Sequence, residues 1–420
     1  MQKIKDFFLQ NKTLRHPVFK NMVWIGVGKI YTQFLRIIFI VIVAREIGPT
    51  PYGAFYYVLY FIATFFILSD WGVGGVFMRD FQKKKNSRPF LVGGFWFVIM
   101  LGILATGFAF WAKKFITDPI AESLYIVLLC SMILDHIRNI ICTIFDAHEK
   151  MHKSTIVEVI NQTLMVLLSI LFFGISFSII SVALAYFLSS LISLIVAYLL
   201  LQEVSLLSLP SIKLSTSYFP YFFREGAPLI FHSSLGVLFF SIDRIMIGFL
   251  RGVTEVGWYT TAIGIISLML IIPSIIIKPL IPHLSKKIHT HIPIQKTIKK
   301  TLILLMLLGG AVALIGEAIG GSLIFFLFGE KFLSSIPILR ILLFSLFFSF
   351  PLAFLDTLFF IYEKIWLNFF ITLIPLTINI IGNLLLIPSY GMMAAAYMTL
   401  ISYMGNFFIT LFFAKKHLSL

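Results

Sequence analysis

Apolar stretches of 18 or more residues recur along this chain from residue 20 to residue 413. Each is long enough to cross about 30 Å of hydrocarbon as an α-helix. Twelve spans are predicted, at residues 20–44, 53–78, 90–112, 123–145, 155–175, 178–201, 226–248, 257–280, 301–326, 335–360, 366–387 and 391–413. Because the runs are continuous rather than short and alternating, the pattern favours helices over a β-barrel. The predicted fold class is all-α integral membrane protein.

Lys and Arg gather in alternate connections between these spans. With a cytoplasmic N-terminus, the inner segments hold 22 basic residues and the outer connections hold five. This bias orients the chain, and an even number of spans places both termini in the cytoplasm. The net charge of +15 therefore reflects topology and does not indicate a nucleic-acid partner. The basic segment 81–88 is expected to contact the head groups of membrane lipids.

The chain also contains an internal repeat. A shift of 204 residues aligns Gly48, Thr50 and Gly53 with Gly252, Thr254 and Gly257. Together with twelve spans, the repeat predicts two six-helix lobes around a central cavity. The expected lobes are residues 1–201 and 226–420, joined by a cytoplasmic linker at 202–225. Substrate is then expected between the lobes, near the middle of the membrane.

Twelve Lys, Arg, Asp and Glu residues lie inside the predicted spans. They are Lys29, Arg36, Asp70, Asp135, Arg138, Glu158, Asp243, Arg244, Lys278, Glu317, Arg340 and Asp356. Exposing them all at the bilayer centre would cost on the order of 30 kcal/mol. We therefore expect them to face protein or a water-filled cavity.

The first span carries a polar stripe. Lys29, Thr32, Gln33 and Arg36 follow the spacing i, i+3, i+4, i+7, which places them on one helix face. A cationic face of this kind suits an anionic substrate such as a phosphate or pyrophosphate group.

Three further spans add polar residues to the predicted chamber. The seventh contains His232, Asp243 and Arg244, the second contains Asp70, and the eighth contains Lys278. The predicted substrate-binding residues are thus Lys29, Gln33, Arg36, Asp70, His232, Asp243, Arg244 and Lys278.

A purely structural interpretation of these residues stays open. Lys29 and Asp70 lie at similar depth and could form an ion pair, and Asp135 could pair with Arg138, three residues along its helix. Across helices, Glu317 could pair with Arg340. Lys278 lies near the cytoplasmic boundary, where its ammonium could reach water. A polar stripe on the eleventh span is expected to form interhelical hydrogen bonds. Its residues are Asn368, Thr372, Pro375, Asn379 and Asn383.

Signals for enzymatic catalysis are absent from the sequence. No P-loop and no metal-ligand spacing occur, and no connection is long enough to hold a separate catalytic domain. The only cysteines, Cys130 and Cys142, fall in one apolar span and do not indicate a disulfide framework. We therefore expect a transporter rather than an enzyme, and no cofactor.

Residues 44–81 resemble the opening signature of Wzx-type polysaccharide flippases. The matching residues are Arg45, Gly48, Pro49, Tyr52, Gly53, Asp70, Gly72 and Arg79, with Ile47 in place of the usual leucine. "VGWYTTA" (256–262), "LFGEKFLSSIPILRIL" (327–342) and "LIPSYGMMAAAYMTLISY" (386–403) are similar to later segments of that family. The likeness covers essentially the whole chain.

The resemblance implies the fold of the multidrug/oligosaccharidyl-lipid/polysaccharide superfamily, with two six-helix bundles that open alternately to either side. It implies transfer of an undecaprenyl-pyrophosphate-linked oligosaccharide, such as an O-antigen unit, across the bacterial inner membrane. Coupling to H⁺ or Na⁺ and contact with other polysaccharide-assembly membrane proteins are further implications. The alternatives are a lipid II-type flippase, a cation-coupled drug antiporter, or a membrane polymerase or ligase of the same pathway.

Overall fold

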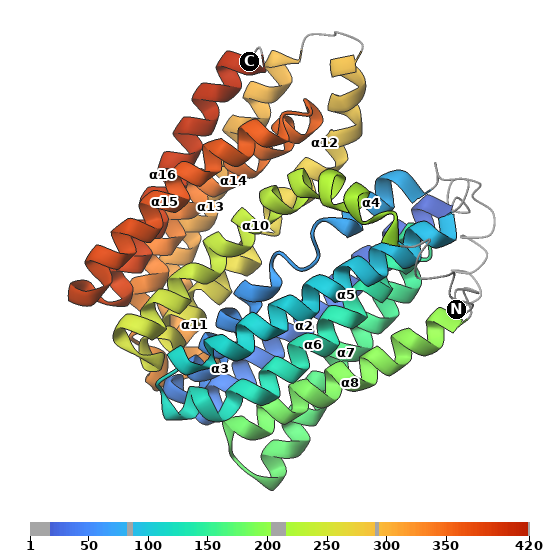
Figure 1. The fold of residues 1–420 in the computed structure, drawn as a ribbon. Coiled ribbons are helices and arrows are strands. Elements are labelled where there is room, and N and C mark those ends of the chain that lie inside the picture. Colours follow the sequence, from blue (N-terminus) through green and yellow to red (C-terminus); the bar gives the residue numbers. More distant parts are fainter. Residues whose placement is uncertain (1–16, 82–86, 203–215, 290–293, 419–420) are drawn as a thin grey trace, which may run out of the picture. The chain divides into compact units, whose positions relative to one another are not determined.

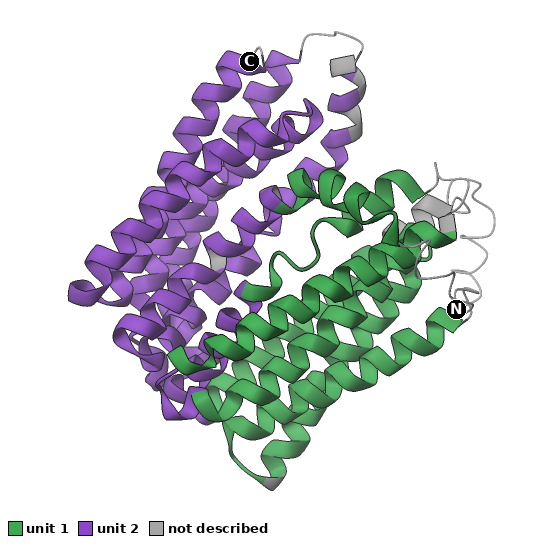
Figure 2. Cartoon of the chain, in the orientation of Figure 1, with its two compact units in different colours: residues 1–46, 65–115, 122–230 green, residues 47–64, 116–121, 231–420 purple. Residues whose placement is uncertain are grey.

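The computed structural model describes residues 17–81, 87–202, 216–289 and 294–418, and this part of the chain is almost wholly helical (Figure 1). It divides into two compact units, which Figure 2 colours separately. Unit 1 comprises residues 1–46, 65–115 and 122–230, and unit 2 comprises residues 47–64, 116–121 and 231–420. The predicted all-α membrane fold is confirmed, since eleven helices of the described residues are long and apolar enough to span a bilayer.

Unit 1 is built mainly from six helices. They are α2 (Pro17–Ile47), α4 (Val73–Asp80), α5 (Ser87–Ala112), α6 (Pro119–Ala147), α7 (Met151–Ile175) and α8 (Ile179–Gln202). A short 3-10 turn, η2 (Lys113–Phe115), follows α5. The pair α7 and α8 pack along their lengths.

Unit 2 contains most of the remaining helices. They are α3 (Pro49–Phe66), α11 (Val253–Met269), α12 (Ile272–His289), α13 (Gln295–Phe328), α14 (Ser335–Ile361), α15 (Ile365–Tyr390) and α16 (Met392–His417). The 3-10 turn η3 (Glu330–Phe332) joins α13 to α14. Helix α14 is the most enclosed span, because α13, α16, α11 and α12 all pack against it.

One helix belongs to both units. Helix α10 (Phe219–Arg251) is continuous, yet its first residues pack in unit 1 and the rest, from residue 231, in unit 2. It begins inside the segment 202–225 that the sequence suggested as a linker, whereas residues 203–215 lie outside the described residues. The lobe boundaries expected from the repeat therefore stay a prediction.

The second predicted span, 53–78, is not one helix. Helix α3 ends at Phe66 and α4 begins at Val73, with turns between them. Trp71 and Gly72 adopt positive φ angles of 45° and 69°, which an α-helix does not allow. The eighth predicted span is also divided, into α11 and α12, but without positive φ angles at the break, and Pro273 is the second residue of α12. Proline is tolerated in the first turn of a helix but breaks a helix interior.

Equivalent positions of the repeat meet inside unit 2. The Oγ1 atoms of Thr50 and Thr254, which are 204 residues apart, lie 2.8 Å from each other. Nearby, a Cβ atom added to Gly53 would collide with the Val253 carbonyl oxygen, and one added to Gly257 would collide with the Pro49 carbonyl oxygen. The two glycines thus allow the starts of α3 and α11 to cross in backbone contact.

Candidate transport site

The polar stripe of α2 is partly accessible in unit 1. Lys29 and Arg36 are exposed, Gln33 is half-buried, and Thr32 is buried. The Thr32 hydroxyl donates to the Lys29 carbonyl at 3.2 Å, so the stripe's smallest member is satisfied by its own helix. Lys29 and Arg36 therefore present two positive charges, about two turns apart, on the accessible face of a membrane-spanning helix.

Lys29 lines a cavity of about 480 Å³ between α2, α6 and α7. The charged residues around this cavity are Lys29, Arg138, Asp146 and Glu158. Gly28 faces α7, where a Cβ atom would collide with the Thr155 methyl group, so the glycine lets α2 approach α7 closely. The cavity is polar and of mixed charge, and it can accept a hydrated or charged group inside the membrane-spanning part of unit 1.

Asp70 does not pair with Lys29. It is exposed in the turn between α3 and α4, and it lines a second cavity of about 210 Å³ with Asp135 and His136. Asn139 lines both cavities, so the two lie side by side along α6. Depth in the membrane alone suggested the wrong partner for Asp70.

The expected pair Asp135 and Arg138 is confirmed, with 2.8 Å between the Arg138 Nη1 and Asp135 Oδ1 atoms. The Tyr186 hydroxyl donates to the other carboxylate oxygen at 2.7 Å. Arg138 also donates to the Ser193 hydroxyl at 3.1 Å. This network fixes α6 against α8 and neutralises Asp135.

Asp243 of α10 is fully buried in unit 2. It accepts hydrogen bonds from the Tyr259 hydroxyl at 2.6 Å, the Thr399 hydroxyl at 2.6 Å and the Asn383 amide at 2.7 Å. One carboxylate therefore joins α10, α11, α15 and α16. In the described conformation it is closed off from substrate.

Two asparagines of the α15 stripe, Asn368 and Asn383, form the interhelical hydrogen bonds expected from the sequence. Asn368 donates to Asp356 of α14 at 3.2 Å, and Asn383 donates both to Asp243 and to Asn379, the latter at 3.1 Å. The Asn379 amide nitrogen and the Asn383 amide oxygen are buried with no partner. In the described residues, no three His, Cys, Asp or Glu side chains cluster as metal ligands would.

The remaining predicted site residues lie in different surroundings. Arg244 is 3% exposed, and its guanidinium carbon lies 4.1 Å from the centre of the Tyr60 ring, a cation–π contact within unit 2. Lys278 is exposed on α12. The side chain of His232 lies outside the described residues. The other pair expected across helices, Glu317 and Arg340, is confirmed at 3.1 Å.

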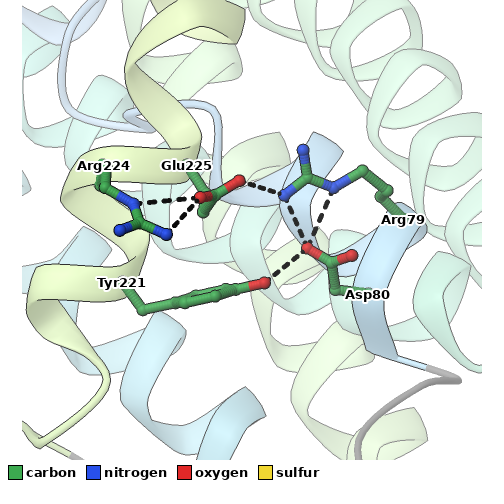
Figure 3. Close-up of polar contacts among 5 residues, drawn as sticks. All are labelled: Arg79, Asp80, Tyr221, Arg224 and Glu225. Carbon is green, nitrogen blue, oxygen red and sulfur yellow. Dashed lines mark hydrogen bonds and ion pairs between the residues drawn. The ribbon is translucent and has the colours of Figure 1, made fainter.

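A polar cluster joins the end of α4 to the start of α10 in unit 1 (Figure 3). Arg79 donates to Asp80 Oδ2 at 2.7 Å and to Glu225 Oε2 at 2.8 Å. The Tyr221 hydroxyl donates to the same Asp80 oxygen at 2.8 Å, and Arg224 donates to Glu225 at 3.1 Å. The cluster therefore holds α4 and α10 together through two links, from Arg79 to Glu225 and from Tyr221 to Asp80.

The cluster shifts the pKa values of its members. Hydrogen bonds from Arg79 and then Arg224 lower the pKa of Glu225, and the hydrogen bond to Asp80 raises the pKa of Arg79. Desolvation, followed by the bond to Asp80, raises the pKa of Tyr221. All three shifts favour the charge states that keep the cluster bonded.

Sequence reasoning did not single out Asp80, Tyr221 or Glu225. Arg79 belongs to the recognised signature, and the following Asp80 is an acidic neighbour that could have drawn attention to the site. His136 was also missed, although a histidine beside Asp135 inside an apolar span is itself a signal.

Comparisons with known proteins agree with this architecture. The family described as "Polysaccharide biosynthesis protein" matches residues 18–287. The capsular polysaccharide biosynthesis protein CapF of Staphylococcus aureus is 23% identical over 383 residues, which cover 90% of this chain and 94% of CapF.

Two solved structures show the fold. The lipid II flippase MurJ, in an inward closed conformation, superposes with a TM-score of 0.77 at 14% identity, covering 94% of this chain and 87% of MurJ. An inward-facing multidrug resistance transporter of the MATE family superposes with a TM-score of 0.72 at 15% identity, covering 95% of this chain and 98% of the transporter. The chain thus belongs to the polysaccharide biosynthesis protein family, and it shares its fold with these two transporters.

Proposed function

We propose that this protein flips a polyprenyl-pyrophosphate-linked oligosaccharide from the cytoplasmic to the periplasmic leaflet of the bacterial inner membrane. The observation that carries the proposal is the accessible cationic stripe of α2, where Lys29 opens onto a polar cavity of about 480 Å³. Family membership and the name of CapF support a surface polysaccharide, an O-antigen-like or capsular repeat unit, as the sugar portion.

The chemistry of such a substrate fits these residues. Its pyrophosphate is anionic and must leave water to cross the membrane, whereas its polyprenyl chain can stay in lipid. Lys29 and Arg36 supply positive charge along the crossing path, and Arg36 offers a planar fork that bonds phosphate oxygens in pairs. Alternating access around a central cavity, with both termini cytoplasmic, completes the proposal.

The alternatives have less support. Likeness to MurJ and to the MATE transporter rests on 14% and 15% identity, which shows the fold and not lipid II or drugs as substrate. The family and its structural neighbours are transporters rather than enzymes, which disfavours a polymerase or ligase.

The proposal is tested by complementing a flippase-deficient strain, with surface polysaccharide and membrane abundance measured together. Lys29→Ala and Arg36→Ala should lower surface polysaccharide strongly at near-normal abundance, and Arg36→Lys should restore only part. Arg340→Ala is the matched control, because this arginine pairs with Glu317 in unit 2. Normal polysaccharide from the Lys29→Ala, Arg36→Ala double variant at normal abundance would contradict the proposal.

Abundance also separates two roles for Arg36. The alternative role is an ion pair with Asp243, which lies at similar depth in the predicted spans, but Asp243 accepts three hydrogen bonds from neutral groups within unit 2. Removing Arg36 therefore leaves the Asp243 carboxylate with its full set of donors. A fall in abundance for Arg36→Ala that Asp243→Asn rescues would instead establish an ion pair between the two.

A further inference from the structure

His136 of α6 lies in a niche that several elements of unit 1 build around its ring. The Phe66 ring meets the imidazole edge-on, with ring centres 5.5 Å apart. Gly102 of α5 faces the ring, and a Cβ atom there would lie 2.6 Å from the imidazole Cδ2 and Nε2 atoms. A glycine is therefore required for α5 to accept the imidazole at this depth of the membrane.

Both ring nitrogens have polar partners. Nε2 lies 3.2 Å from the Val98 carbonyl oxygen, and Nδ1 lies 3.3 Å from the Ser69 hydroxyl. Because a carbonyl oxygen only accepts, Nε2 carries a hydrogen. The Ser69 hydroxyl also lies 2.7 Å from the Phe66 carbonyl oxygen.

This arrangement suits two protonation states of His136. In the neutral ring, Nδ1 accepts a hydrogen bond from the Ser69 hydroxyl. In the imidazolium, Nδ1 donates to the Ser69 oxygen, whose hydrogen turns to the Phe66 carbonyl. Only one hydroxyl hydrogen moves, so a proton can bind without rearrangement of heavy atoms.

Of the carboxylates near His136, one is available to balance the positive charge of an added proton. On α6 itself, Asp135 is paired with Arg138, and from α8 the Tyr186 hydroxyl donates to Asp135. In the turn before α4, Asp70 lines the same cavity as His136 and forms no ion pair with any described residue. The residues of α5 that face the ring, Val98 and Gly102, carry no charge.

We propose that His136 and Asp70 form a proton-binding pair, which cycles between a neutral imidazole and an imidazolium balanced by the carboxylate. A proton rather than a metal ion is the ligand, because both imidazole nitrogens are already engaged with Val98 and Ser69. Its use in transport rests on the proposed function, and the site is distinct from the closed Asp243 network.

The position of Asp70 connects this pair to α10. Asp70 precedes Trp71, whose indole nitrogen donates to the Phe223 carbonyl at 2.9 Å and whose ring stacks on Phe223 at 4.9 Å. Gly72 and Gly226 allow the backbones to touch, since a Cβ on either would collide with the other segment. A charge change at Asp70 therefore acts beside the start of the helix that continues into unit 2.

Proton binding is measured directly by NMR of the full chain, ¹⁵N-labelled at histidine, in nanodiscs. The His136 signal is the one that His136→Gln removes, and it should shift with pH as the imidazole binds a proton. Asp70→Asn should move its midpoint to lower pH by about one unit, because a nearby carboxylate favours the imidazolium. The control His148→Gln, in the turn that follows α6, should leave the His136 signal unchanged. A signal that does not titrate, or ignores Asp70→Asn, would overturn the pair.

Coupling is measured by the pH profile of surface polysaccharide production in the complemented strain. His136→Gln and Asp70→Asn should flatten that profile at normal membrane abundance, whereas His148→Gln should keep the wild-type profile. A wild-type profile from His136→Gln would refute coupling. If the wild-type protein failed to complement the flippase-deficient strain, the proposed function would be refuted. The proton-binding pair would not be, because the NMR titration does not depend on complementation.

Discussion

Replacing Asp243 tests how far one buried carboxylate holds four helices of unit 2 together. In Asp243→Ala, the Tyr259 hydroxyl, the Thr399 hydroxyl and the Asn383 amide all lose an acceptor at 2.6–2.7 Å. Each buried orphan costs about 1–3 kcal/mol. Relief of the carboxylate's own desolvation offsets part of this cost, so we expect a net loss of about 3–5 kcal/mol.

Asp243→Asn is the matched variant, because it keeps the shape of the side chain. Its amide oxygen can accept from both hydroxyls, and its amide nitrogen would face Asn383, whose own oxygen has no partner. Turning the Asn383 amide satisfies the new donor but gives up its 3.1 Å bond to Asn379. The expected cost is therefore one ordinary hydrogen bond, about 1 kcal/mol.

The assay is thermal unfolding of the purified full chain in detergent, with membrane abundance measured in cells. Asp243→Ala should unfold at a markedly lower temperature than Asp243→Asn, and only the alanine variant should be scarce in the membrane. Because the carboxylate is closed off from substrate, the asparagine variant should retain most surface polysaccharide. Equal stability of the two variants would show that the three donors do not depend on Asp243.

Three other features give direct predictions. Gly257→Ala should destabilise the chain by about 1–3 kcal/mol, because the new methyl group meets backbone atoms. Gly264→Ala, with open space in the same helix, should be neutral or stabilising by up to about 1 kcal/mol in the same thermal assay. The pKa of Glu225 is lowered from its ordinary value of 4.5, so its pairing stabilises the cluster above that pH and is lost as pH falls through the folded value. Hydrogen exchange of the start of α10 should show this loss in wild type but not in Glu225→Gln, while Glu122→Gln, at an exposed ion pair, leaves it unchanged. The predicted topology places residue 287 in the cytoplasm. A cysteine introduced there, in a background without native cysteines, should therefore not react with an impermeant thiol reagent in intact cells. Labelling at this position would contradict the predicted topology.

The helices and the local ion pairs were predictable because short-range rules determine them. Bilayer thickness fixes the length of each apolar run, and the spacing of Asp135 and Arg138 places them on one helix face. The break at Trp71 and Gly72 was not predictable, because their left-handed backbone is held by contacts with α10, more than 150 residues away.

The candidate site was predictable only in part, for a related reason. The helical spacing of the α2 stripe identified Lys29, which does line a cavity. The neighbours of Asp70 could not be derived from the sequence. Depth in the membrane does not show which way a side chain points when its residue lies in a turn rather than in a helix. The niche of His136 depends on a glycine and a carbonyl oxygen supplied by α5, and neither has a sequence signature.

The crossing of α3 and α11 has the geometry of a subunit interface contained in one chain. In a twofold-symmetric homodimer, contacts are isologous: each is repeated with the partners exchanged, and a residue on the axis meets its own copy. Thr50 meets Thr254 in this way, while Pro49 faces Gly257 and Val253 faces Gly53. An ancestral chain that carried one copy of the repeat, with this surface, would have been complementary to a second copy of itself. Gene fusion could then join two such copies without the need to evolve a new interface.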